Sequence, residues 1–150
     1  MTRAEYMAHV YLSGIAAATE RTLELRDEIR YQQDLTQEKD LTADRVQSSG
    51  IGNPTEQTAI KVIALKERLE EQIEDLLEYR IEALRLMDAA GLTASEQQII
   101  RDRYFPSETE VRRPPTWEDI ARQRGYSDKH IYKVRRKALL KMAAVMEGQT

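Results

Sequence analysis

The residues best suited to chemistry form a short basic run, DKHIYKVRRK, at positions 128–137. Its lysines and arginines can neutralise phosphates and release the counterions condensed on nucleic acid. Polar side chains among these cations can reach the edges of bases. The run therefore indicates nucleic-acid binding. The competing interpretation is that the charges only solvate a terminal helix.

Two helices joined by a tight turn are expected to position this run. Thr116 is a suitable N-cap for the first helix and Ser127 for the second, and Gly125 between them can adopt the left-handed conformation that ends a helix. Upstream, Thr93 and Glu96 fit the capping box of a preceding helix. The expected buried residues are Trp117, Ile120 and Ala121 in the first helix, and Ile131, Val134, Ala138 and Met142 in the second. This pattern predicts a helix-turn-helix, which lays its second helix in the major groove of DNA.

Three stretches resemble region 4 of the sigma-70-type sigma factors of RNA polymerase: LTASEQQIIRDRYF (92–105), TWEDIARQRGYS (116–127) and KVRRKALLKM (133–142). The front half, with VQSSGIGNPTE at 46–56, resembles small sigma-like proteins of phages, similar to late-transcription regulators of the ArpU and RinA kind. The resemblance implies a sequence-specific, DNA-binding regulator of phage genes in the host bacterial cytoplasm. It also implies an activator that contacts RNA polymerase.

By this resemblance, the residues after the Ser127 cap read bases and those further along hold phosphate. The expected base-reading residues are Asp128, Lys129, His130, Tyr132 and Lys133, and the expected phosphate contacts are Arg136, Lys137 and, at the start of the first helix, Thr116. Ser127 is also expected to contact DNA. Two features depart from the family. A carboxylate at 128 would repel phosphate unless it accepts from cytosine, and the loop 106–115 is longer than usual, with Arg112 and Arg113 available for phosphate.

The charge of the chain is divided unevenly. The whole chain carries −3, whereas residues 111–142 carry ten Lys or Arg and three Asp or Glu, which leaves −10 on the remainder. A basic segment on an acidic body is expected of a DNA-binding protein. The chain has no cysteine, and no apolar run approaches the length that spans a bilayer, so neither a disulfide nor a membrane partner is expected.

Other side chains are better explained by structure than by chemistry. Trp117 is expected in the core rather than stacked on bases, and two separate histidines without cysteine do not form a zinc site. The many carboxylates of the second long helix are expected to be a solvated face. With no glycine-rich phosphate loop and no nucleophile–base pair, we expect no enzyme, no metal and no cofactor.

The expected fold is all-α, with a long N-terminal helical hairpin over residues 1–90 and a loop at 47–53, followed by the helix-turn-helix domain at 91–146. The hairpin would pair two apolar stripes, although a second copy of the chain could cover them as a homodimer. The first stripe comprises Ala4, Ala8, Tyr11, Ile15, Ala18, Thr22, Leu25 and Ile29. The second comprises Val62, Leu65, Leu69, Ile73, Leu76, Leu77, Ile81, Leu84 and Met87.

One alternative from another functional class fits the same pattern. A helical hairpin with a basic helix-turn-helix also suits a phage assembly or packaging protein resembling a small terminase subunit, and a sigma mimic that binds polymerase but little DNA is a variant of it. The mass in solution separates them, because a packaging ring needs many copies whereas a regulator needs one or two.

Overall fold

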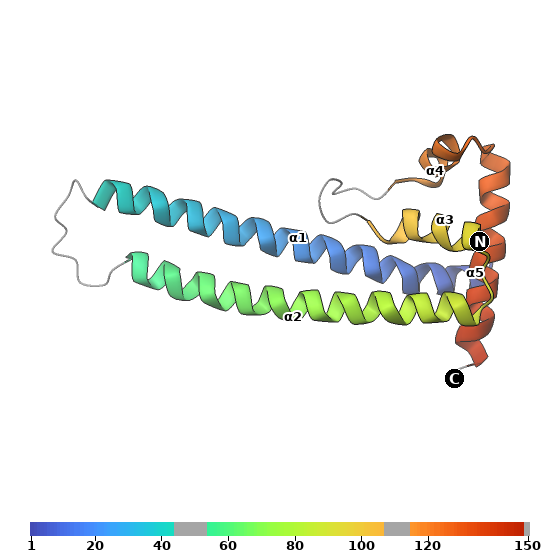
Figure 1. Ribbon diagram of the computed structural model, residues 1–150, viewed down its shortest axis with the longest axis horizontal. Coiled ribbons are helices and arrows are strands. Elements are labelled where there is room, and N and C mark those ends of the chain that lie inside the picture. Colours follow the sequence, from blue (N-terminus) through green and yellow to red (C-terminus); the bar gives the residue numbers. More distant parts are fainter. Residues whose placement is uncertain (44–53, 107–114, 149–150) are drawn as a thin grey trace. The chain divides into compact units, whose positions relative to one another are not determined.

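The computed structural model describes residues 1–43, 54–106 and 115–148, and within these ranges all regular structure is helical. The helices are α1 (Arg3–Ala43), α2 (Pro54–Ala89), α3 (Ala94–Tyr104), α4 (Trp117–Arg124) and α5 (Asp128–Gly148) (Figure 1). The predicted all-α class is confirmed. The expected loop at 47–53 and the two loop arginines Arg112 and Arg113 lie outside the described residues.

The chain divides into two compact units, each described by itself. One combines residues 1–20 with residues from Leu76 onward, and the other spans residues 21–75. The expected domain boundary between residues 90 and 91 does not coincide with the boundaries of these compact units. The division into two domains at that point stays a prediction. No helix in the described part of the chain is long and apolar enough to cross a membrane.

The unit of residues 21–75 contains the later part of α1 and the earlier part of α2. Thr22 and Ile29 of α1 are buried, as the heptad pattern predicts, and Val62 is buried on α2. Ile60 and Ile63 of α2 remain 64% and 58% exposed. This unit therefore buries a narrow apolar seam and leaves large apolar side chains at its surface.

In the other unit, the start of α1 and the end of α2 supply part of a shared core. The expected residues Ala8, Ile15, Leu76 and Met87 are buried. Among the buried residues that were not expected are Leu12, Thr19, Ala83 and Leu86.

The expected burial of Leu77 and Ile81 is wrong, because they are 50% and 48% exposed. Leu76, Ala83 and Met87 follow one another at steps of seven and four and so share a face, whereas Leu77 and Ile81 lie about 100° around the helix. One stripe of α2 packs into the core, and the neighbouring stripe does not.

Gly14 of α1 faces Tyr79 of α2 at a close approach. A Cβ at Gly14 would lie 2.5 Å from the Tyr79 hydroxyl oxygen and 3.2 Å from the ring atom that carries it. The Tyr79 hydroxyl donates to the carbonyl oxygen of Tyr11, which holds the ring in place. The glycine is therefore required by packing, although it weakens an isolated helix.

We expect Gly14→Ala to lower the free energy of unfolding by about 1–3 kcal/mol, because overpacking outweighs the helix propensity that alanine adds. Urea denaturation followed by circular dichroism measures the change. In a Tyr79→Phe background, the closest atom is gone and the loss should be smaller. An equal loss in both backgrounds would contradict this explanation.

Capping residues fix the starts of all three C-terminal helices and the end of α4. Thr93 with Glu96 and Thr116 with Asp119 form capping boxes at the starts of α3 and α4. Gly125 has φ 70° and ends α4 in the left-handed conformation. The hydroxyl oxygen of Ser127 then accepts from the backbone N–H of His130 at 3.1 Å and so caps α5. The predicted caps at Thr93, Thr116 and Ser127 are confirmed.

The same three helices pack against one another around a continuous core. Its main members are Ile99, Ile100, Tyr104, Trp117, Ile120, Ala121, Ile131, Ala138, Leu139, Met142 and Ala143. The prediction that Trp117 belongs to the core is confirmed, since it is 7% exposed. Val134 was expected in the stripe of α5 but is only half-buried, and Leu139 takes the buried place instead.

Candidate nucleic-acid interface

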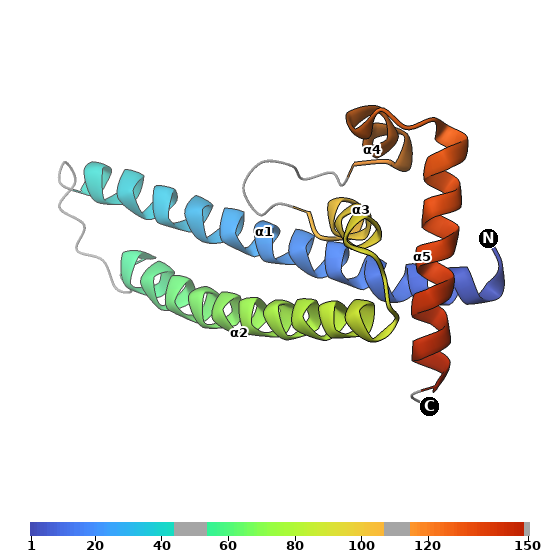
Figure 2. The same cartoon turned by 45° about the vertical axis from the view of Figure 1, so that its right-hand side comes forward.

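The helix α5 lies beside α3 and α4 (Figure 2). It buries an apolar stripe and leaves a basic face exposed. The exposed cations on this face are Lys129, Lys133, Arg136 and Lys137. Asp128 and His130 are also exposed in the first turn. The structure therefore brings together most of the residues that the sequence nominates for contact with bases and phosphates, on one helix and on its solvent side.

Three nominated residues have their polar atoms engaged. The hydroxyl oxygens of Thr116 and Ser127 accept backbone N–H groups at their helix starts, so their first role is capping. The Tyr132 hydroxyl donates to the Glu118 carboxylate of α4. This bond raises the pKa of Tyr132 and lowers the pKa of Glu118. Tyr132 thus links α4 to α5 across the turn, a role that sequence reasoning did not assign.

Two ion pairs attach this group of helices to α3. Lys141 of α5 lies 2.8 Å from the nearly buried carboxylate of Glu96, and Arg124 of α4 lies 2.7 Å from Asp102. Burial alone would raise the pKa of Glu96, but hydrogen bonds from Lys141 and Thr93 outweigh it and lower the pKa. Lys141 is therefore a structural cation, unlike the exposed lysines of the same helix.

Arg135 is a cation of the interface that the sequence did not single out. Its guanidinium lies over the rings of Tyr132 and Trp117, 4.7 and 5.9 Å from their centroids. Arg103 of α3 lies 5.8 Å from the centroid of the Trp117 ring. Within the described ranges, no carboxylate is within ion-pair distance of Arg103 or Arg135. Arg135 belongs to the basic run, so the sequence could have nominated it. Its position beside Trp117 can be seen only in the folded chain.

These two guanidinium groups act on His9 of α1. The His9 Nδ1 atom lies 2.7 Å from the Tyr104 hydroxyl oxygen, and burial raises the pKa of that hydroxyl to about 12. Desolvation, followed by the charges of Arg103 and Arg135, lowers the pKa of His9 below its usual 6.5. The Nδ1 atom of a neutral His9 can accept a hydrogen bond from the Tyr104 hydroxyl.

The folded chain should therefore lose stability at low pH, where His9 must take up a proton. Because the pKa is lowered only in the folded chain, the unfolded chain binds more protons below pH 6.5, and stability falls as pH drops through that region. We expect the melting temperature of the wild type to fall more steeply between about pH 7.5 and 5.5 than that of a His9→Gln variant. Parallel pH profiles would show that His9 does not contribute.

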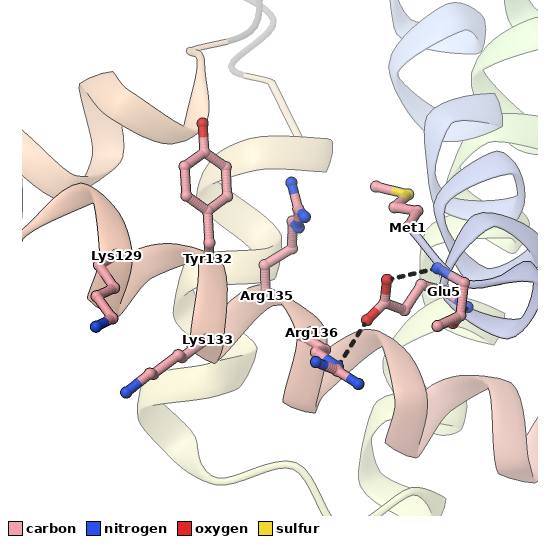
Figure 3. Close-up of a pocket in the computed structure, with 8 residues that line it drawn as sticks. Met1, Glu5, Lys129, Tyr132, Lys133, Arg135 and Arg136 are labelled. Atoms are coloured by element: carbon pink, nitrogen blue, oxygen red, sulfur yellow. Dashed lines mark hydrogen bonds and ion pairs between the residues drawn. The ribbon is translucent and has the colours of Figure 1, made fainter.

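A shallow groove of about 520 Å³ lies between the first turn of α1 and the basic face of α5. Figure 3 shows its residues: Met1, Thr2, Glu5, Lys129, Tyr132, Lys133, Arg135 and Arg136. The Glu5 Oε1 atom lies 3.3 Å from the Arg136 Nε atom, and the Glu5 side chain is 4% exposed while that of Arg136 is 66% exposed. Four cations and one carboxylate thus line the groove, which gives it an excess of positive charge.

Comparison with known proteins gave no match to a protein-family model, to a curated protein or to a solved structure. The functional assignment therefore depends on the geometry of this chain and on the resemblance of its motifs. In the described part of the chain, no group of three or more His, Cys, Asp or Glu side chains is placed to hold a metal ion.

Proposed function

We propose that the chain is a sequence-specific DNA-binding transcriptional regulator that reads double-stranded DNA with α5. The observation that carries this proposal is the separation of faces on α5: Ile131, Ala138 and Met142 are buried, while Lys129 and Lys133 project into solvent. A helix that is anchored on one side and cationic on the other suits the major groove, whose width admits one helix.

The connection between α4 and α5 supports a helix-turn-helix in particular. A short helix ends at the left-handed Gly125, Tyr126 follows, and Ser127 caps the longer basic helix. This is the arrangement in which the residues of the first turns of the second helix face base edges. In our proposal, Lys129 and Lys133 contact bases, and Arg136 and Lys137 contact phosphates on either side.

The resemblance to region 4 of sigma factors supports a role in transcription of phage genes, including activation through contact with RNA polymerase. We further propose that a homodimer forms through the helical region, because Leu77 and Ile81 leave an apolar strip of α2 exposed. A monomer or dimer in solution agrees with the regulator. Eight or more copies would favour the packaging alternative.

A salt series tests DNA binding itself. The affinity of the full chain for a short duplex of random sequence should fall linearly on logarithmic axes as salt rises, with a slope of about −0.9 for each phosphate neutralised. We expect a slope between about −3 and −5, because four exposed cations of α5 are available. Negligible affinity even at low salt would overturn the proposal.

A further inference from the structure

The groove between the first turn of α1 and α5 extends the basic face beyond the helix that reads DNA. Lys129 and Lys133, the proposed base contacts, line it together with Arg135 and Arg136. A DNA strand that lies along α5 would therefore bring its phosphates past this groove. Because the groove is open rather than enclosed, it fits a group that remains attached to a polymer.

One cation of the groove lacks an anionic partner. The Nε–H group of Arg135 is buried and donates to no acceptor within the described residues, and no described carboxylate forms an ion pair with its guanidinium. Arginine favours planar, bidentate contact with phosphate oxygens. An anion in the groove would compensate this charge, whereas a cationic or apolar group would not.

A second cation, Arg136, forms an ion pair with a carboxylate that is itself fixed. One oxygen of Glu5 accepts the backbone N–H of Thr2 at 3.0 Å, and the backbone N–H of Glu5 donates to the Thr2 hydroxyl at 3.2 Å. The other oxygen accepts no hydrogen bond and lies 3.3 Å from the Nε atom of Arg136, with which it forms an ion pair. This contact engages one edge of the guanidinium and leaves its two terminal nitrogens for another acceptor (Figure 3).

We propose that this groove seats a backbone phosphate of the bound DNA, and that Glu5 is a positioning residue that holds Arg136 for it. The inference rests on the proposed DNA binding and adds α1 to the interface. A carboxylate near a phosphate opposes binding by repulsion, but a fixed arginine loses less side-chain entropy when it binds. In this groove the second effect outweighs the first, because Glu5 is nearly buried and three other cations surround the site.

The test compares four variants of the full chain for binding to a short duplex of random sequence. Arg136→Gln should weaken binding by roughly 10-fold for all sequences alike and make the salt slope shallower by about one. Glu5→Gln should weaken binding by roughly 3-fold although it removes a negative charge. Glutamine can still close the capping box of α1, so the helix start is preserved.

The double variant should bind no worse than Arg136→Gln alone, since Glu5 acts through Arg136. The matched control is Arg85→Gln, which removes an exposed arginine of α2 outside the groove and should leave affinity within about 2-fold. Tighter binding by Glu5→Gln, or additive losses in the double variant, would overturn the positioning role.

Two further outcomes separate this inference from the proposed function. If the wild type does not bind the duplex at all, the proposed function fails. If the wild type binds but Arg136→Gln binds equally well, only the assignment of the groove fails. Titration with inorganic phosphate, followed by NMR, adds a third arm: phosphate binding that Arg136→Gln abolishes without any change in DNA affinity would also overturn the inference.

Discussion

Reversing the charge of Lys129 and Lys133 together is expected to abolish most DNA binding. Both side chains are exposed on α5, so Lys129→Glu with Lys133→Glu should leave the helical content and the melting temperature close to those of the wild type. Two attractive contacts become repulsive, and affinity for a duplex should fall by on the order of 100-fold or more at about 0.1 M salt. Fluorescence anisotropy of a labelled duplex measures this loss.

A matched pair of changes on α2 shows whether position or total charge is responsible. Lys61→Glu with Lys66→Glu alters the net charge by the same amount, at two exposed lysines of another helix. We expect this control to change affinity by less than about 3-fold, because neither lysine belongs to the basic face of α5 and a change in net charge alone is screened by salt. If both double variants lose the same affinity, the basic face of α5 is not a specific interface.

Replacing Trp117 by alanine should have the largest effect on stability. The side chain is 7% exposed, its ring meets Tyr104 edge to face with centroids 5.8 Å apart, and Arg103 and Arg135 lie over it. Loss of a buried tryptophan costs about 3–5 kcal/mol, most of the stability of a small domain. Because α4 would lose its anchor, DNA affinity should fall with stability.

Circular dichroism in urea is the appropriate measurement, since Trp117 is the only tryptophan of the chain and its fluorescence disappears with it. The Trp117→Phe variant is the control. It retains a ring for Tyr104 and for both guanidinium groups and should lose roughly half as much stability. A loss below about 1 kcal/mol for Trp117→Ala would mean that Trp117 does not hold the three helices together.

The sequence predicts the C-terminal helices well because capping residues close in sequence determine where these helices begin and end. Thr93, Thr116, Gly125 and Ser127 each act through atoms within a few residues, so spacing alone identifies them. The buried stripe of α2 was less predictable. Its helix carries apolar residues over a wide arc, and only the packing of neighbouring helices decides that Met87 is buried while Ile81 is exposed.

The candidate interface likewise has features that the sequence predicts and features that it does not. Lys129, Lys133 and Arg136 of α5 follow one another at steps of four and three, so their shared exposure follows from helical periodicity. The contacts of Glu5 with Arg136, Tyr132 with Glu118 and Arg135 with Trp117 join different helices. They depend on tertiary packing, and no spacing within one segment reveals them.

The central claim is that α5 reads a particular DNA sequence, and selection of bound duplexes from a random pool tests it most directly. The account predicts enrichment of a short common motif by the wild type, in two half-sites about one DNA turn (roughly 34 Å) apart if the chain acts as a dimer. The variant with Lys129→Glu and Lys133→Glu should enrich no motif. A pool that stays unenriched with the wild type, or the same motif recovered with that variant, would contradict the claim.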